Sequence, residues 1–356
     1  MRSTGSVRRA AAAVAAALAL AAVLTSGGAA PPGAAGTTVT RTYTVWHWNV
    51  SGHKLNKGRV DTGMVTAALD SIKDPEQSPD FVSFNELCHS QYEEIRDRLK
   101  DTPNAWTGAT GYALWSQTHP AGTGICQGEA FGNALFSRAE LRGGENHLLP
   151  ADYTRAEVDG GAYHEDRSLL CAPLAGRTRM KFCTTHITTS NRRLPDVNSA
   201  KINTQQLGAV RDILRGFAAA GETYLVAGDF NAEPDMSRMG SLMTTHTELD
   251  STDERCPDYG EWTAVDNPEI NDPDTRPAPC AANEGNPKID LILAPTDRLT
   301  GPAAGPGPGF TAGTKPIPTT CSLDGGTTHQ PCSDHRILIG TATLEVDLPV
   351  TPPAGT

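Results

Sequence analysis

Six short motifs in this 356-residue chain place polar side chains at or beside the end of an apolar, strand-like segment. Asn49 ends Trp-His-Trp-Asn, Glu86 follows Phe-Val-Ser-Phe-Asn, and His186 ends Phe-Cys-Thr-Thr-His. The other three motifs are Gly228-Asp229-Phe230-Asn231, Lys288-Ile289-Asp290 and Ser333-Asp334-His335. Each group alone would be an ordinary cap or a satisfied polar side chain, but six at strand ends can converge on one rim. Acid and amide oxygens bind hard cations and imidazole carries protons near neutral pH, so the set predicts a reactive site.

In this order, the motifs resemble the endonuclease/exonuclease/phosphatase family. Pancreatic-type deoxyribonuclease, abasic-site endonucleases, bacterial sphingomyelinases and inositol polyphosphate 5-phosphatases belong to it. The resemblance runs from about Tyr43 to Val346, and Gly-Asp-Phe-Asn followed by Ser-Asp-His is its most specific part. It implies a four-layered α/β sandwich, in which two packed, mainly antiparallel sheets are flanked by helices, and Mg²⁺-dependent cleavage of phosphate esters.

The resemblance assigns Asn49, Glu86 and Asp334 to a metal site, with Asp334 acting directly or through water. Hard oxygen ligands suit Mg²⁺, and Mn²⁺ is a possible substitute. Two carboxylates about 4 Å apart would repel by about 4 kcal/mol at an effective dielectric of 20, and a dication removes that repulsion. The same ion would neutralise a phosphate oxygen as charge develops on it.

The remaining matches imply catalytic roles. His335 takes the family's base or proton-relay position, and Asp290 is its partner, which fixes the tautomer and favours the imidazolium. Asp229 and Asn231 match positions that orient the attacking water and a phosphate oxygen. His186 matches the second histidine, which contacts the scissile phosphate and protonates the leaving oxygen. Whether His335 or Asp229 is the base stays open.

Two further residues are expected to bind substrate or support the site. His186 needs a carboxylate of its own, and Glu129, just before Gly132-Asn133-Ala134-Leu135-Phe136-Ser137-Arg138, is the candidate. Arg167 opens Arg-Ser-Leu-Leu, about where some relatives place a phosphate-binding arginine. The alternative for Arg167 is a surface salt bridge.

Composition limits the class of protein. With 38% hydrophobic and 20% charged residues, the chain can fold around a core, which excludes wholesale disorder and a collagen-like fibre. Lys and Arg number 30 against 41 Asp and Glu, a net charge of −11, so a basic groove that binds nucleic acid by bulk charge is not expected. An anionic substrate would need a local source of positive charge, such as a metal ion.

The first thirty residues have the order of a secretory signal. A basic start is followed by an apolar run from Ala10 to Leu24 and by small residues up to Ala30. The alternative is an N-terminal membrane anchor, although the run is short for a bilayer. We therefore expect a signal peptide over 1–30, a flexible leader over 31–41, the catalytic domain over 42–347 and a disordered tail over 348–356.

Eight cysteines in an exported chain indicate disulfides. Sequence cannot choose among the 105 connectivities, and nearest neighbours are the working hypothesis: 88–126, 171–183, 256–280 and 321–332. A zinc site is the alternative, but no pair has the C-x-x-C spacing.

Strand patterns dominate and helical patterns interleave with them. We expect strands at 43–50, 80–85, 131–137, 168–172, 180–187, 223–227, 289–294 and 336–346. Helices are expected at 60–72, 90–99 and 200–218, an irregular stretch at 251–287, and an exposed Gly- and Pro-rich loop at 301–320. No linker divides the chain, so one α/β domain with two packed sheets fits best.

Together these features predict a secreted, Mg²⁺-dependent phosphodiesterase of the nuclease type. Two histidines suit phosphodiester cleavage, because one can activate water while the other protonates a poor leaving group. The expected partner is DNA or RNA, acted on by a monomer without stable membrane insertion. The alternative is a lipid- or inositol-directed enzyme, either a sphingomyelinase-like phospholipase C or a phosphoinositide phosphatase. Residues 301–320 hold only Phe310 as an aromatic and are too rich in Gly and Pro for the exposed hairpin of sphingomyelinases. A third possibility is a binding module that keeps the fold without turnover.

Overall fold

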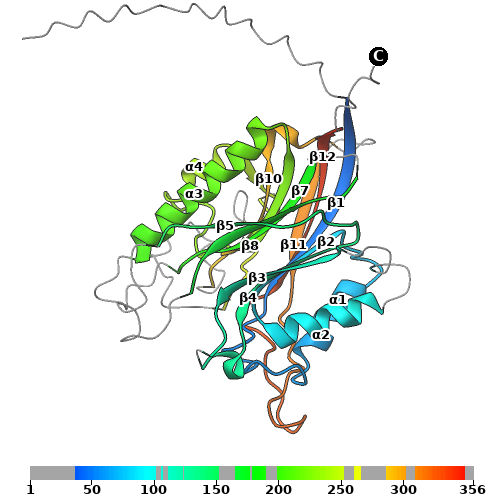
Figure 1. Ribbon diagram of the computed structural model, residues 1–356, viewed down its shortest axis with the longest axis vertical. Coiled ribbons are helices and arrows are strands. Elements are labelled where there is room, and N and C mark those ends of the chain that lie inside the picture. The colour runs from blue at the N-terminus through cyan, green and yellow to red at the C-terminus, as the bar shows by residue number, and fades with distance from the viewer. Residues whose placement is uncertain are drawn as a thin grey trace, which may run out of the picture. The chain divides into compact units, whose positions relative to one another are not determined.

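The computed structural model describes residues 37–101, 106, 111–122, 124–151, 165–176, 179–189, 199–251, 260–265, 286–301 and 309–348. Its described part contains two six-stranded sheets that pack face to face, with helices outside them (Figure 1). The fold is therefore the α/β sandwich that the sequence predicts. The expected signal peptide and most of the leader and tail lie outside the described residues.

The first sheet has the strand order β11-β12-β1-β2-β4-β3. Its strands are β1 (Thr38–Asn49), β2 (Phe81–Cys88), β3 (Ala113–His119), β4 (Phe131–Ser137), β11 (Phe310–Lys315) and β12 (Ile337–Asp347). Only β1 and β2 pair in parallel among these neighbours, and the other pairs are antiparallel.

The second sheet has the order β5-β6-β7-β8-β10-β9. Its strands are β5 (Glu145–Leu148), β6 (Ser168–Pro173), β7 (Met180–His186), β8 (Thr223–Asp229), β9 (His246–Glu248) and β10 (Asp290–Pro295). It repeats the pattern of the first sheet, because β7 and β8 are parallel and the other pairs antiparallel.

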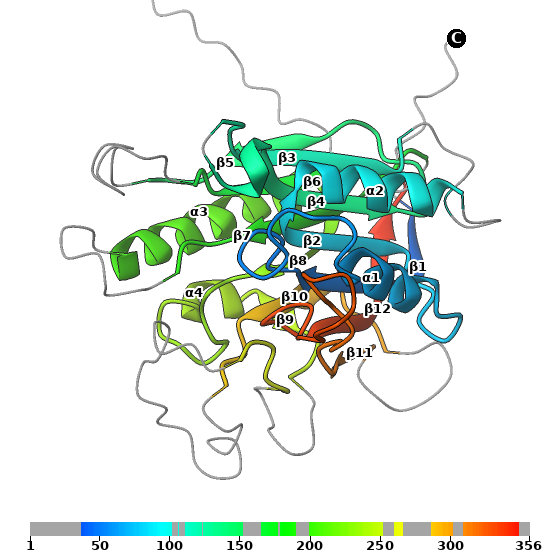
Figure 2. The ribbon, with the colours of Figure 1, turned by 90° about the horizontal axis from the view of Figure 1, so that it is seen from below.

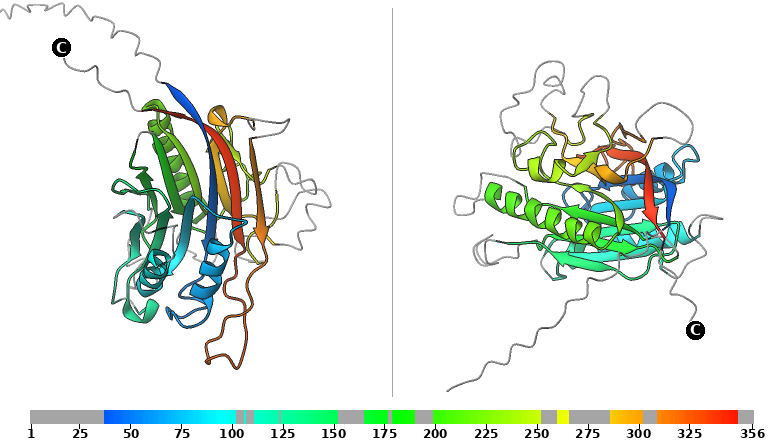
Figure 3. Two further views of the ribbon diagram at one scale, coloured as in Figure 1. Left: turned by 90° about the vertical axis from the view of Figure 1, so that its right-hand side faces the viewer. Right: turned by 90° about the horizontal axis from the view of Figure 1, so that it is seen from above.

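Helices cover the outer face of each sheet (Figures 1 and 2). Helices α1 (Met64–Lys73) and α2 (His89–Lys100) pack on the first sheet, where Trp46, Trp48 and Phe84 belong to their apolar core. On the second sheet lie α3 (Ser199–Ala219) and the short α4 (Gly240–Met243). Single 3₁₀ turns occur at Cys126–Gly128 and Thr296–Arg298. The layers are seen edge-on in Figure 3.

Strand alternation divides the side chains between the central core and the outer ones, because successive residues of a strand point to opposite faces. On β1, Tyr43 and Val45 face the other sheet, whereas Trp46 and Trp48 face the helices. On β8, Leu225 and Ala227 face inward in the same way. The rows between the sheets are thus apolar along the middle of the sandwich.

The structure corrects several expected boundaries. Strand β1 begins at Thr38 instead of Tyr43, because Thr38 to Arg41 pair with the end of β12, so the last residues of the expected leader belong to the sheet. The segment expected as an exposed loop at 301–320 contains β11, whose Phe310–Lys315 ladder pairs with β12. Gly and Pro flank that strand, and threonines and one aromatic within it suit a sheet edge.

Strands β3, β5 and β9 were not expected from the sequence. All three are sheet-edge strands, and β5 and β9 are only four and three residues long. Short edge strands carry little hydrophobic periodicity, since half of their pairing partners are missing and one face is exposed.

Three disulfides occur within the described residues: Cys88–Cys126, Cys171–Cys183 and Cys321–Cys332. They confirm three of the four expected nearest-neighbour pairs, and Cys256 and Cys280 lie outside the described residues. Of the helices that the structure describes, none is sufficiently long and apolar to cross a membrane.

Candidate active site

The inward-facing rows of five strands change from apolar to polar at one end of the sandwich. The inner row of β1 continues into His47 and Asn49, and that of β2 into Asn85. The inner rows of β7, β8 and β10 carry, at the same end, His186, Asp229 and Asp290. Register brings them together, since Asn49 pairs with Asn85 while Asp229 lies between His186 and Asp290.

Glu86 reaches this end by a break in its strand. Alternation alone would point it away from the other sheet, but the pairing of β2 with β4 shifts register between Phe84 and Leu87. Glu86 itself has φ 61°, a left-handed conformation that is rare outside glycine. The bulge turns its carboxylate inward, where Asn49 Nδ2 donates to Glu86 Oε1 at 3.2 Å. Strained backbone of this kind is concentrated at functional sites.

Asp229 is the centre of the cluster. Its Oδ2 accepts a hydrogen bond from Asn49 Nδ2 at 3.0 Å and lies 3.5 Å from His186 Nε2 and 3.9 Å from His335 Nε2. Its backbone amide donates to Asn85 Oδ1 at 2.9 Å, which ties the end of β8 to the first sheet. Two histidines, one at the end of β7 and one just before β12, thus face one carboxylate oxygen.

His335 belongs to a tightly bonded chain. Its Nδ1 lies 2.7 Å from Asp290 Oδ2, and His47 Nε2 lies 3.1 Å from the other oxygen, Oδ1. Ser83 Oγ holds the second nitrogen of His47 at 2.6 Å, and Asp290 is fully buried. Burial alone would lower the pKa of His335, but the charges of Asp290, Asp229 and Asp334 outweigh it and raise the pKa to about 10. This ring therefore carries a proton at neutral pH.

His186 has a looser environment. Its Nδ1 lies 3.7 Å from Glu165 Oε1 and, although buried, has no hydrogen-bond partner among the described residues. Glu165 accepts from Thr118 Oγ1 at 3.1 Å and pairs with Arg167 Nη2 at 2.9 Å. Burial and the charges of Arg167 and His335 lower the pKa of His186 well below its ordinary value. This ring is therefore neutral at pH 7.

Arg167 lies near His186, and its positive charge helps to lower the pKa of that ring. Arg167 is the partner of Glu165, and its side chain is 12% exposed. Its Nε and Nη1 are buried and lack a hydrogen-bond partner within the part of the chain that the structure describes. Buried donors without partners are costly, so these two N–H groups are suited to an anionic ligand.

Carboxylates are crowded at the other side of the cluster. Burial and the charges of Asp334 and Glu165 raise the pKa of Glu86 to about 7. Burial and the charge of Asp290 raise that of Asp229, also to about 7. Burial would also raise the pKa of Asp334, but His335 and a 2.9 Å contact from Lys54 Nζ leave it lowered. A divalent cation would stabilise these buried carboxylates in their charged form and offset the repulsion between them, so the oxygen-donor set fits such an ion.

A second group of potential ligands has atoms within 4.8 Å of one another: Asp229, Asp290 and His335. Here the geometry favours proton handling over metal binding. His335 Nδ1 is already bonded to Asp290, and a protonated imidazole has no lone pair for a metal. Asn49, Glu86 and Asp334 remain the better donor set for a hard cation.

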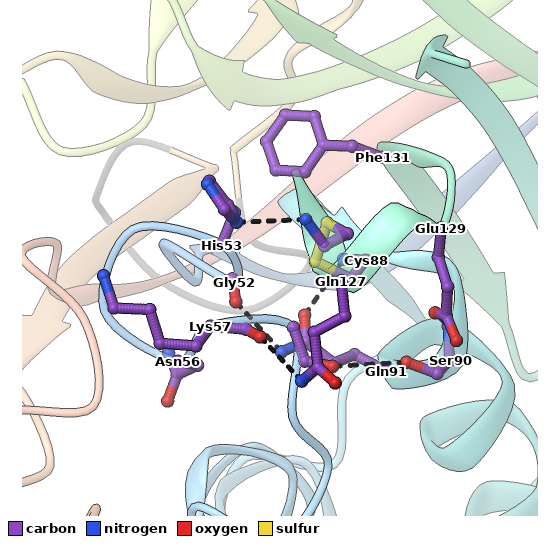
Figure 4. Close-up of a disulfide and its surroundings, with 12 residues drawn as sticks. Gly52, His53, Asn56, Lys57, Cys88, Ser90, Gln91, Gln127, Glu129 and Phe131 are labelled. Carbon is purple, nitrogen blue, oxygen red and sulfur yellow. Dashed lines mark hydrogen bonds between the residues drawn. A yellow bond between two sulfur atoms is a disulfide. The ribbon is translucent and has the colours of Figure 1, made fainter. Parts of the chain in front are cut away.

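Asn231 and Glu129 differ in outcome. Asn231 is brought to the site: its backbone amide donates to Asp229 Oδ1, and its Nδ2 donates to the carbonyl of Ile187, next to His186. Glu129 is not. Its exposed carboxylate accepts from the backbone amide of Ser90 at the start of α2 (Figure 4). The expectation that Glu129 supports His186 is therefore wrong, because Glu165 occupies that place.

The profile of the Endonuclease/Exonuclease/phosphatase family matches residues 46–335, which span most of the chain and every site residue from Asn49 to His335. The chain belongs to the endonuclease/exonuclease/phosphatase family. Members of this family are hydrolases that act on phosphoester bonds, and they typically use a divalent metal. A comparison of the sequence with curated proteins gives no significant match.

Solved structures of this family share the fold at low identity. The endonuclease/exonuclease/phosphatase from Beutenbergia cavernae DSM 12333 is 16% identical with a TM-score of 0.52, over 85% of this chain and 72% of that chain. D. rerio TDP2 complexed with single strand DNA product is 16% identical (TM-score 0.52; 85% and 98% covered). The human Nocturnin catalytic domain with bound sulfate anion is 15% identical (TM-score 0.53; 88% and 97% covered).

Sequence reasoning missed three residues of this family member's site. His47 and Asn85 share the inward parity of Asn49, so the alternation of β1 and β2 could have indicated both. Glu165 lies two residues before Arg167, at the entry to β6, and this spacing is the only signal that the sequence offers for it. Its contact with His186 depends on the pairing of β6 with β7.

Proposed function

We propose that this protein is a secreted, Mg²⁺-dependent phosphodiesterase of the nuclease type, which hydrolyses phosphodiester bonds by attack of water. One observation carries the proposal: two buried histidines face the same oxygen of Asp229, and their surroundings give them opposite charge states. A protonated and a neutral imidazole beside one carboxylate is an arrangement suited to general acid–base chemistry.

The pKa directions distinguish the two candidates for the base. His335 holds its proton up to a pKa of about 10, so it cannot accept one at neutral pH. Asp229, with a pKa raised to about 7, can take the proton of an attacking water. The imidazolium of His335 then holds the proton that the leaving oxygen requires, and Asp290 keeps the ring in position. His186 and Arg167 supply hydrogen-bond donors for phosphate oxygens.

Asn49, Glu86 and Asp334 would hold the cation. When bound, Mg²⁺ would neutralise the phosphate and lower the pKa of the attacking water. Export is supported by the signal-like residues 1–30 and by the three disulfides, since disulfides persist in oxidising compartments. The protein is proposed to act as a monomer on DNA or RNA.

The lipid-directed alternative gains no support from the corrected strand β11. The described part of residues 301–320 contributes one strand, which pairs with β12 and forms no hairpin within that segment. Phe310 is only partly exposed and packs against the core between the sheets, which leaves no aromatic side chain in β11 for insertion into a membrane.

The test is a substrate panel on the mature protein with Mg²⁺ and with chelator. Plasmid DNA, RNA, sphingomyelin and the diester bis(p-nitrophenyl) phosphate are assayed side by side, with the His335→Ala variant as the control for contaminating activity. We expect Mg²⁺-dependent cleavage of nucleic acid and of the model diester, absent from the variant. Hydrolysis of sphingomyelin alone would favour the lipid-directed alternative, and no metal-dependent hydrolysis of any substrate would overturn the proposal.

A further inference from the structure

A short loop at the mouth of the site concentrates positive charge in an acidic protein. Residues 51–59, which follow Asn49 and β1, read Ser-Gly-His-Lys-Leu-Asn-Lys-Gly-Arg and contain no acid. The whole chain carries a net charge of −11. Lys54, Lys57 and Arg59 therefore make this segment locally positive in an acidic protein, next to the proposed metal ligand Asn49.

Of these cations, Lys54 reaches the site. Its Nζ lies 2.9 Å from Asp334 Oδ2, and the two side chains are 69% and 30% exposed. Lys57 instead donates to the carbonyl of Lys54 within the loop, and Arg59 forms a two-bond pair with Asp61. The loop therefore offers the ammonium group of Lys54 to the site, whereas Lys57 bonds within the loop and Arg59 bonds to Asp61 and to the carbonyl of Leu323.

The Lys54–Asp334 pair can exchange partners easily. Ion pairs as exposed as this one stabilise a protein by at most about 1 kcal/mol, because water screens both charges. Asp334 is also one of the proposed cation ligands, and a carboxylate that neutralises a metal has less charge to offer a lysine. The ammonium group of Lys54 is then well placed to bind a different anion at the same mouth.

The backbone of the loop is fixed on the side of Glu86. Gly52 N donates to the carbonyl of Glu86 at 2.9 Å, and Gln91 Nε2 donates to the carbonyl of Gly52 at 3.1 Å. A Cβ atom at Gly52 would collide with both Glu86 O and Gln91 Oε1, so the close approach of loop and strand requires glycine there. These hydrogen bonds attach the loop to β2, the strand that carries the proposed metal ligand Glu86.

The Cys88–Cys126 disulfide fixes the other side (Figure 4). Cys88 is two residues after Glu86, and Cys126 N donates to His53 Nδ1 at 3.0 Å. The neighbouring Gln127 donates to the carbonyl of Lys57 at 2.9 Å. Both contacts come from a segment that the disulfide attaches to β2, so Lys54 is presented from a pre-organised loop, which lowers the entropy cost of binding a ligand.

We propose that residues 51–59 form a substrate-binding arm and that Lys54 is its contact with a phosphate group of the substrate. The inference rests on the proposed phosphodiesterase function and deepens it, because it assigns a second phosphate-binding element in addition to Arg167. A lysine suits this role as a compact point charge on a flexible stem, which can follow a phosphate without demanding one geometry.

The experiment compares Lys54→Met with Lys315→Met. Lys315 is the matched control, because it also forms a lysine–aspartate pair, at 3.1 Å from Asp74, and lies outside the proposed machinery. Binding of a short fluorescein-labelled single-stranded oligonucleotide is measured by anisotropy at saturating Mg²⁺, in the His335→Ala background to prevent cleavage. KM and kcat for DNA are measured in the otherwise wild-type protein.

We expect Lys54→Met to raise the dissociation constant and KM by about three- to tenfold, with kcat within about twofold, and to reduce the slope of log K against log salt by about 0.7 to 1. Lys315→Met should change neither. Equal dissociation constants and salt slopes for the two variants would contradict the proposed phosphate contact of Lys54. A decrease in kcat without a change in KM would contradict it as well. If the wild type cleaves no phosphodiester, the proposed function fails instead, and the anisotropy result still decides whether Lys54 contacts phosphate.

Discussion

Two histidines at one end of the sandwich are almost equally buried and face the same oxygen of Asp229, yet their other neighbours differ. His335 is bonded to Asp290, which His47 also holds, and two further carboxylates lie near it. The carboxylates of Asp229, Glu165 and Glu86 lie 3.5 to 3.9 Å from the ring nitrogens of His186, and Arg167 adds a positive charge beside it. Burial lowers the pKa of both rings, and only around His335 do the carboxylates outweigh it.

The comparison shows that burial lowers the pKa of both rings, and that the neighbouring charges decide the difference in charge state between them. The nearby carboxylates and the hydrogen bond to Asp290 fix His335 as an imidazolium. His186 stays neutral, and its Nδ1 and the Arg167 Nε and Nη1 atoms beside it lack hydrogen-bond partners among the described residues, so they are available to a ligand. The first region is built to hold a proton, and the second to receive an anion.

The largest expected effect comes from removing the charged member of the pair. His335→Ala should lower kcat by about a thousandfold or more, because it deletes a proton-transfer group at the reacting centre. Steady-state kinetics on DNA with saturating Mg²⁺ measure the loss, and circular dichroism checks that the fold remains. Turnover close to that of the wild type would contradict the assignment of His335.

Next in size is the metal ligand on the side of His186. Glu86→Gln keeps the shape of the side chain but loses its charge, so the Mg²⁺ concentration for half-maximal activity should rise by at least about tenfold, a loss that outer partners of a metal alone can cause. Calorimetric titration of Mg²⁺ gives a readout independent of activity. An unchanged titration would remove Glu86 from the ligand set.

A sharper test compares the carboxylate that faces His186 in the structure, Glu165, with the carboxylate that the sequence suggested for that role, Glu129. Glu165→Gln removes the acid that faces His186 and should lower kcat by less than the roughly hundredfold that loss of an acid–base group itself costs. Glu129→Gln is the matched control and should have no effect, because the Glu129 carboxylate accepts from the backbone amide of Ser90 at the start of α2 and does not face His186. The opposite order of the two effects would restore Glu129 to the role that the sequence suggested.

The smallest effects concern stability, where the two histidines should give opposite pH slopes in the presence of chelator. The pKa of His335 is raised to about 10, so its contribution is complete below pH 6.5 and is lost as pH rises toward 10. The lowered pKa of His186 makes the folded state lose stability as pH falls below 6.5, since only the unfolded chain takes up that proton.

Thermal unfolding from pH 5 to pH 10 measures both slopes. His335→Asn should flatten the curve between about pH 6.5 and 10, and His186→Asn should flatten it below about pH 6.5. If both substitutions flatten the same limb, the two rings do not have opposite charge states and the comparison fails.

The site was largely predictable because its residues follow recognisable strands. Asn49, His186, Asp229 and Asp290 each end or begin an inward-facing apolar row, so alternation and motif order indicate them together. Glu129 was assigned to the site wrongly because the prediction also relied on its position next to a strand. It precedes a strand in the sequence, but nothing in that pattern shows that the chain there turns outward to α2.

The edges of the fold were less predictable than its centre. Buried strands such as β2 and β8 have strong apolar patterns, whereas β5 and β9 are short and lie at sheet edges. Strand β11 exists because β12 offers it a ladder of hydrogen bonds, which its own Gly-rich surroundings do not reveal. Pairing of this kind is a property of two segments, and a local window contains only one of them.

The sequence by itself indicated the α/β sandwich and most members of the polar cluster, because hydrophobic alternation and residue type are local properties. Only the tertiary structure decided which carboxylate serves which histidine. It also turned Glu86 inward through a bulge, and it brought Lys54 to Asp334, 280 positions away in the chain. Charge states depend on distances across two sheets, and those distances exist only once both sheets have packed.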